Sequence, residues 1–294
     1  MLSARSRAIL DRYTLSSRAV SRQSGERSSR EPGQSVEFHD FRPYQPGDEL
    51  RYVDWRVYAR TGRLYTRLYQ AERAVKLHLV LDNSASMSIG RKAEYGRILV
   101  QLLSYVAQRD APTQVHLLGG GSSKQSQGPS GMRETWRFVE EAPVVTGSGV
   151  GALTALKRFA LSLPSQRGSG LALVVSDLFE DAPIRPALTA LRARGMDIGF
   201  LHVVAEEDLE PPTGLLELHE LESGERLPAG PDEARAYREE VQRYLERTRN
   251  AVVRAGFKHL LLRCPAAGTR EASGDRLERD AFAALIRSAV LVKR

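Results

Sequence analysis

The sequence predicts an α/β protein with a doubly wound, mainly parallel sheet, a small N-terminal β-rich clasp and a hairpin insertion. From Ala74 onward, short apolar runs that suit buried strands alternate with segments of helical periodicity, which is typical of a parallel sheet covered by helices on both faces. Residues 36–72 differ, because they are dense in aromatic residues and arginine. We therefore expect an N-terminal part over residues 1–73 and the main domain over residues 74–294.

The N-terminal part is predicted to begin with a short helix in "LSARSRAILDRY", followed by a polar linker. Residues 62–69, "GRLYTRLY", alternate as a strand does. Because this part is too short and too polar for a core of its own, we expect it to clasp the main domain, with aromatic residues over a sheet edge and two aspartates paired to arginines. The aromatic residues are Tyr44, Tyr52 and Trp55. The aspartates are Asp48 and Asp54, and their expected partners are Arg42, Arg51 or Arg56. A partner-binding surface is the compatible alternative, since interfaces are rich in aromatic residues and arginine.

The elements of the main domain follow in order from the periodicity of the apolar residues. Predicted strands cover residues 74–82, 113–119, 171–177, 197–204 and 257–264. Predicted helices cover residues 92–108, 134–141, 151–163, 185–194, 232–255 and 276–288. A Gly- and Ser-rich loop is expected over 119–131, and a hairpin insertion near 213–230, which turns at Ser223 and Gly224.

Composition narrows the class of protein. With 41% hydrophobic and 27% charged residues, the chain reads as globular. No uncharged apolar run of about 18 residues is present, so we expect no membrane span. The single cysteine, Cys264, excludes an internal disulfide framework and suits a reducing compartment, so a cytoplasmic location is expected.

The net charge of +7 is unevenly distributed. Arginines crowd the first thirty residues and recur between Arg51 and Arg73, whereas residues 206–240 are largely acidic. A basic surface of this kind suits phosphate, an anionic membrane or an acidic protein. Because no recognised nucleic-acid-binding motif accompanies the charge, a nucleic-acid binder is the last of three alternatives, to be tested by steep salt dependence.

Two predicted strands end in an aspartate, at Asp82 and at Asp177. Ser84 and Ser86 follow the first of them at two-residue spacing. Each aspartate alone is explained by capping of a turn or helix. Together, at the carboxyl ends of parallel strands, they would bring carboxylates and hydroxyls to one point, and these are the oxygen ligands that Mg²⁺ prefers. The sequence therefore predicts a cation site formed by Asp82, Ser84, Ser86 and Asp177.

These stretches resemble a known family. "DNSASM" resembles the Asp-x-Ser-x-Ser element of the metal-ion-dependent adhesion site (MIDAS) in von Willebrand factor type A domains, and "VVSDLFED" resembles the strand end that bears its distal aspartate. The stretch "RPYQPGDELRYVDWRVYARTGRLY" is similar to the hallmark of a bacterial group, domain of unknown function 58, which joins such a segment to a von Willebrand type A domain. The resemblance covers the chain from about residue 10 to its end.

The resemblance implies a further ligand, a cofactor and a partner. Sites of this family take a threonine from a Gly-Thr-x-Leu pattern, where this chain has "VVTGSGVGAL", so that Ser148 or Thr146 is the expected donor. It implies Mg²⁺, with Mn²⁺ or Ca²⁺ as alternatives. Members are commonly encoded beside MoxR-type AAA+ ATPases, which implies a non-enzymatic, metal-dependent adaptor in chaperone-like or assembly activity. Its partner would be that ATPase or another protein that offers an acidic side chain.

An enzyme is the alternative. Asp82 and Asp177 with a metal ion could support hydrolysis or phosphoryl transfer. Against it, the sequence offers no placed general base, no second metal cluster and no phosphate-cradling Lys or Arg. We therefore predict no catalytic residue.

Overall fold

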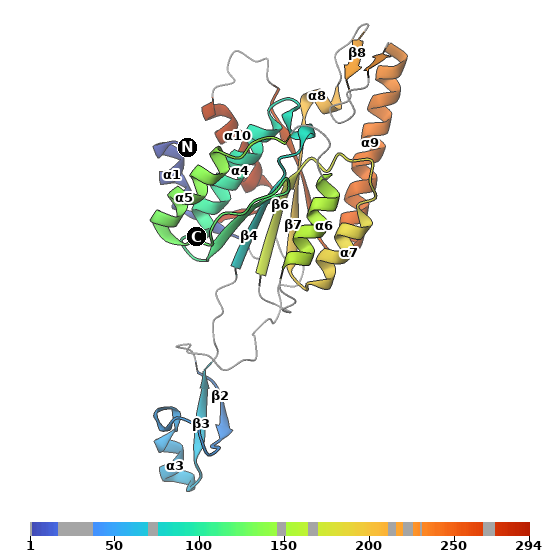
Figure 1. The fold of residues 1–294 in the computed structure, drawn as a ribbon. Coiled ribbons are helices and arrows are strands. Elements are labelled where there is room, and N and C mark those ends of the chain that lie inside the picture. Colours follow the sequence, from blue (N-terminus) through green and yellow to red (C-terminus); the bar gives the residue numbers. More distant parts are fainter. Residues whose placement is uncertain are drawn as a thin grey trace. The chain divides into compact units, whose positions relative to one another are not determined.

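The chain divides into two compact units, which Figure 1 shows. This computed structural model describes residues 2–16, 38–69, 76–145, 151–163, 170–210, 216–219, 226–229, 231–266 and 274–294. Unit 1 combines residues 1–24 with residues 75–294, and unit 2 consists of residues 25–74. Each unit is described by itself.

Unit 1 is built on a five-stranded parallel sheet with the strand order β10-β7-β6-β4-β5. The strands are β4 (Lys76–Leu81), β5 (Thr113–Leu117), β6 (Gly170–Ser176), β7 (Asp197–Ala205) and β10 (Lys258–Cys264). The order reverses at β4, since β5 lies on one side of it and β6 on the other. The predicted α/β class with a mainly parallel sheet is thus confirmed, and its switch point lies at the end of β4.

Helices cover both faces of this sheet (Figure 1). One face packs against α4 (Lys92–Ala107), α5 (Gly128–Glu140) and α10 (Gly274–Arg287), with Leu99, Leu103 and Val139 fully buried there. The other face packs against α6 (Ala152–Ser162), α7 (Arg185–Ala193) and α9 (Pro231–Arg254). Helix α5 begins at Gly128, earlier than the predicted 134, because the last part of the expected Gly-rich loop forms its first turns.

The N-terminus of the chain belongs to unit 1. Helix α1 (Ala4–Leu10) buries Leu10 in the same core as α4, and β1 (Tyr13–Leu15) pairs antiparallel with the C-terminal β11 (Leu291–Lys293). The side chain of Arg109 donates to the carbonyl oxygens of Leu10 and Tyr13. Residues 2–16 therefore pack on the main domain, whereas the prediction had placed all of residues 1–73 in one N-terminal part.

The insertion follows β7. Helix α8 (Glu206–Leu209) leads to the antiparallel hairpin β8 (Leu216–His219) and β9 (Arg226–Ala229), and then to the long α9. The hairpin lies within the predicted 213–230, and its predicted turn at Ser223 and Gly224 lies outside the described residues.

Unit 2 joins β2 (Phe38–Pro43) to β3 (Tyr65–Tyr69) antiparallel, with the 3-10 helix η1 (Leu50–Tyr52) and α3 (Trp55–Thr61) between them. Asp54 accepts hydrogen bonds from the backbone N–H groups of Arg56 and Val57 and so caps α3, a helix that the sequence analysis did not predict. The ion pair of Asp54 is with Arg67, which corrects the predicted choice among Arg42, Arg51 and Arg56.

A second aspartate of unit 2 pairs as predicted. The carboxylate of Asp48 lies 2.7 Å from Arg42 and also accepts from Thr66 and from the backbone N–H of Gln45. The prediction that this part clasps the main domain stays a prediction.

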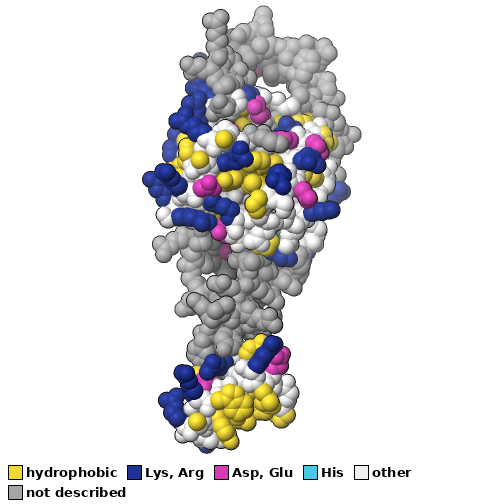
Figure 2. Space-filling model, turned by 90° about the vertical axis from the view of Figure 1, so that its left-hand side faces the viewer, with side chains coloured by type: hydrophobic (Ala, Val, Ile, Leu, Met, Phe, Trp, Pro, Cys, Tyr) yellow, Lys and Arg dark blue, Asp and Glu magenta, His cyan; other side chains and the backbone are white. Residues whose placement is uncertain are grey.

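Apolar side chains also reach the surface of unit 2. Figure 2 shows hydrophobic side chains gathered on one side of it, and the large ones that are exposed are Phe41, Leu50, Trp55 and Tyr58. None of the helices in the described part of the chain combines the length and the apolar character needed to cross a membrane.

Candidate metal centre

Two neighbouring strands bring the predicted aspartates to one edge of the sheet. Asp82 directly follows β4, and Asp177 directly follows β6, the strand paired in parallel with β4. The backbone N–H of Asp82 extends the ladder by donating to the carbonyl oxygen of Val175 at 2.9 Å. Because both strands run in the same direction, their two carboxylates emerge side by side.

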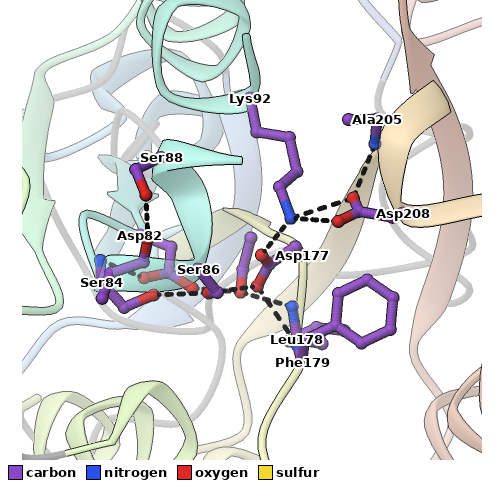
Figure 3. A network of polar contacts seen from close by, with 12 residues as sticks. Asp82, Ser84, Ser86, Ser88, Lys92, Asp177, Leu178, Phe179, Ala205 and Asp208 are labelled. Carbon is purple, nitrogen blue, oxygen red and sulfur yellow. Dashed lines mark hydrogen bonds and ion pairs between the residues drawn. The ribbon is translucent and has the colours of Figure 1, made fainter. Parts of the chain in front are cut away.

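The four predicted residues form one continuous set of contacts, drawn in Figure 3. Asp82 Oδ1 accepts from the backbone N–H of Ser84 at 2.9 Å, and the hydroxyls of Ser84 and Ser86 lie 3.1 Å apart. The hydroxyl of Ser86 then donates to Asp177 Oδ1 at 3.1 Å. Asp82, Ser84, Ser86 and Asp177 are thus brought together as the sequence predicts.

The two aspartates differ from ordinary turn-capping residues in their burial. Asp82 is 2% exposed and Asp177 is 0% exposed. Burial, reinforced by the charge of Asp177, raises the pKa of Asp82 to about 6. Both aspartates do accept backbone N–H groups within their own loops, as capping requires, but capping does not need two buried carboxylates beside one another.

Ser176 fixes one oxygen of the Asp82 carboxylate. Its hydroxyl donates to Asp82 Oδ2 at 2.5 Å and accepts from the backbone N–H of Leu178 at 2.9 Å. Leu178 has a φ of 53°, a left-handed conformation that turns the chain sharply after Asp177. The strand end is therefore shaped to present Asp177 while Ser176 fixes the orientation of Asp82.

A buried lysine completes the centre. Lys92, the first residue of α4, is 0% exposed, and its ammonium group lies 2.7 Å from Asp177 Oδ2 and 2.9 Å from Asp208 Oδ2 (Figure 3). Asp208, on α8, also accepts from the backbone N–H of Ala205 at 2.8 Å. A cation at the N-terminus of a helix is disfavoured by the helix dipole, so the two carboxylates are what keep Lys92 there.

The charges of the centre do not cancel. The centre contains three carboxylates, of Asp82, Asp177 and Asp208, and one ammonium group, of Lys92, so that the fully ionised set carries a net charge of −2. One divalent cation would balance that charge. The donors at Asp82, Ser84, Ser86 and Asp177 are carboxylate and hydroxyl oxygens, the types that a hard cation such as Mg²⁺ prefers, although no three His, Cys, Asp or Glu side chains of the described residues are grouped to hold a metal ion.

The loop hydroxyl is the part of the predicted site that stays a prediction. Thr146 and Ser148 lie outside the described residues. Just before them, the backbone N–H of Val145 donates to the carbonyl oxygen of Asn83 at 2.7 Å, so Val145 lies beside the loop that bears Ser84.

On the other side, α6 begins against the loop that follows Asp177. Glu180 accepts from the backbone N–H of Leu153 at 2.5 Å and so caps the first turn of α6. A Cβ atom on Gly151 would collide with the carboxylate of Glu180, so a larger residue there would force that carboxylate to move. The described residues on either side of Thr146 and Ser148 therefore contact the two loops that supply the aspartates.

Sequence reasoning missed Lys92, Ser176 and Asp208. Asp208 had a usable signal, because it lies four residues beyond the end of the predicted strand 197–204, where the same strand-end argument applies. Ser176 was visible as the residue before Asp177. Lys92 had no signal, since a lysine at the start of an amphipathic helix is ordinarily solvated.

A comparison with models of protein families identifies the family of this chain. The model of the family described as protein of unknown function DUF58 matches residues 40–251, more than half of the chain. The chain belongs to this family. Its match includes unit 2 from residue 40 onward, both predicted aspartates, Lys92 and Asp208.

Proteins of two mycobacteria are similar to this chain. Uncharacterized proteins of Mycobacterium tuberculosis and of Mycobacterium bovis are each 29% identical over 211 residues. The alignment covers 66% of this chain and 63% of each relative, so the chain spans less than two thirds of the length of the relatives it matches. Among solved structures, proximal thread matrix protein 1 from the mussel byssus aligns over 44% of this chain and 38% of its own, with 14% identity. Its TM-score of 0.35 carries no argument about the fold.

Proposed function

We propose that the chain is a non-enzymatic, metal-dependent protein-binding adaptor, in which the centre at the ends of β4 and β6 is a von Willebrand type A adhesion site. One observation carries the proposal: Asp82, Ser84, Ser86 and Asp177 contact one another in series, from two strands at the switch point of a parallel sheet. This is where α/β proteins bind ligands.

Each residue has a defined part in this proposal. Asp82 and Asp177 supply charge, Ser84 and Ser86 supply neutral oxygens, and Thr146 or Ser148 is the proposed further donor. Ser176 orients Asp82, while Lys92 holds Asp177 and offsets part of its charge. Bound Mg²⁺, or Mn²⁺ or Ca²⁺ in its place, would offer an open coordination position to a carboxylate oxygen of another protein.

The proposed partner is a MoxR-type AAA+ ATPase or another protein with an exposed acidic side chain. Family resemblance supports the ATPase, and the chemistry of the centre supports the acidic side chain. An adaptor needs a cation whose binding strength is moderate and reversible, and a resident ammonium group beside Asp177 lowers the affinity for a divalent ion relative to an unopposed carboxylate cluster.

The test is capture of a purified cognate MoxR-type ATPase in Mg²⁺ and in EDTA. We expect capture by the native chain in Mg²⁺, loss in EDTA, and loss in Asp82→Ala. Ser88→Ala is the matched control, because the hydroxyl of Ser88 donates to the carbonyl oxygen of Ala85 within the same loop.

Two outcomes would overturn the adaptor. Capture that persists in EDTA would remove the metal from binding. Turnover of a phosphoester panel that is lost in Asp82→Ala would instead make the centre that of a hydrolase or phosphoryl-transfer enzyme.

A further inference from the structure

A second candidate site lies between α7 and α9, in the helical layer on the face of the sheet that α4 does not cover. The two helices enclose a cavity of about 560 Å³. It is lined by Arg185, Leu188, Thr189, Arg192, Arg247, Asn250, Ala251, Arg254 and Ala255. None of these residues belongs to the centre at Asp82, so this cavity, which we call the arginine groove, is independent of the proposed metal site.

The spacing of the residues shows that the groove follows both helices. On α7, Arg185 and Arg192 are seven residues apart, which places them on one face two turns from each other. On α9, Arg247 and Arg254 repeat the same spacing. Each helix therefore contributes a pair of guanidinium groups to a common groove.

Most of this charge has no partner within the described part of the chain. Arg247 pairs with Glu240 at 2.5 Å, but the described residues place no carboxylate within ion-pair distance of Arg185, Arg192 or Arg254. Arg192 and Arg254 lie in the last turns of their helices, where the dipole favours cations. Arg185 lies in a first turn, where the dipole opposes it, so helix stability does not account for the set.

The floor of the groove is apolar. Leu188 is 3% exposed, and the small side chains of Ala251 and Ala255 leave the space between the helices open. No aromatic side chain lines the groove, so bases would find no stacking surface there. An apolar floor between arginine pairs instead matches a protein segment that carries apolar side chains and carboxylates, since Arg binds carboxylates in a bidentate manner.

We propose that the arginine groove is a docking site for an acidic, amphipathic segment of a partner protein. Its carboxylates pair with Arg185, Arg192 and Arg254, and its apolar side chains rest on Leu188 and Ala251. This site goes beyond the metal-dependent contact, because it needs neither Asp82 nor a divalent ion.

The test uses a short fluorescein-labelled peptide with Glu on one helical face and Leu on the other, followed by fluorescence anisotropy on the full chain. Replacing both exposed arginines of α7, Arg185→Gln with Arg192→Gln, should weaken binding about tenfold or more, because two charge-assisted contacts are lost together, and tenfold corresponds to about 1.4 kcal/mol. The matched control is Arg133→Gln with Arg137→Gln on α5, two exposed arginines at helical spacing on the other side of the sheet. We expect the control to bind nearly as the native chain does.

A variant that leaves the net charge unchanged distinguishes binding in the groove from nonspecific attraction between the acidic peptide and a basic protein. Ala251→Phe fills the floor and should also weaken binding, whereas EDTA and Asp82→Ala should leave it unchanged. Circular dichroism confirms that each variant folds. The proposal is overturned if the α5 control loses as much affinity as the α7 variant, if Ala251→Phe binds as tightly as the native chain, or if single-stranded DNA of equal charge binds more tightly than the peptide.

Discussion

At the scale of single residues, the centre depends on a lysine that has no access to water. Lys92 is bound by Asp177 and Asp208, and all three side chains are nearly or fully buried. Removing one member of a buried ion pair costs far more than the pair contributes, because the remaining charge stays without compensation. The ammonium group also links the loop after β6 to α8, so one side chain positions Asp177 and ties it to the start of the insertion.

We expect Lys92→Met to lower the free energy of unfolding by about 3–5 kcal/mol in EDTA, since two buried carboxylates lose their counter-charge. Urea denaturation measures it. The double variant Lys92→Met with Asp208→Asn removes one of these carboxylates and should recover part of the loss. Mg²⁺ should raise the stability of Lys92→Met more than that of the native chain. Equal stabilisation of the two by Mg²⁺ would contradict the placement of Lys92 beside a cation site.

At the scale of elements, the sheet contains pairs of partly buried imidazoles that bridge neighbouring strands. His78 on β4 and His116 on β5 lie 3.0 Å apart between ring nitrogens, and His116 also contacts the hydroxyl of Ser122. Burial, followed by the charge of His78, lowers the pKa of His116 to about 4, and burial with the charge of Lys76 lowers that of His78. The packed state therefore needs both rings neutral.

This pair predicts a pH dependence. The unfolded chain binds protons near the ordinary histidine pKa of about 6.5, whereas the folded pair binds them only at lower pH, so the free energy of unfolding falls as pH drops from about 6.5 toward 4. At about pH 5, His116→Gln should reduce this slope by up to about 1.4 kcal/mol per pH unit, measured by urea denaturation at several pH values. Ser122→Ala, which keeps both rings, should retain the slope. Parallel curves for native chain and His116→Gln would refute the assignment.

Elements whose signal is local were predictable from the sequence, and those set by distant contacts were not. The apolar strand before Asp82 and the helix at residues 92–108 have strong periodicity, and both were found within a residue or two of their observed ends. Strand β1 has only three residues and exists because β11, at the other end of the chain, pairs with it. Helix α3 is short and rich in aromatic residues, so only its Asp54 cap reveals where it starts.

At the scale of the whole molecule, the candidate site also has a part that the sequence predicts and a part that only distant contacts create. Strand order brings Asp82 and Asp177 together, and the alternation of strands and helices was enough to predict that much. The third carboxylate and the lysine arrive from α8 and α4, whose side chains meet only in three dimensions. Unit 2 has its own polar network, in which Asp48 and Asp54 each join a strand to a loop or helix, so we expect it to keep its order without the sheet of unit 1.

If unit 2 is ordered by its own contacts, a substitution inside it should affect that unit alone. Asp54 is 6% exposed, caps α3 and pairs with Arg67, so Asp54→Ala removes the cap and the pair together. Amide hydrogen exchange over residues 38–69 should then accelerate about tenfold or more, while exchange over residues 76–145 stays as in the native chain. Glu49→Ala is the control, because the Glu49 pair with Arg51 is solvent-exposed and contributes little. Acceleration that spreads into β4 and α4 would show instead that the two units form one cooperative structure.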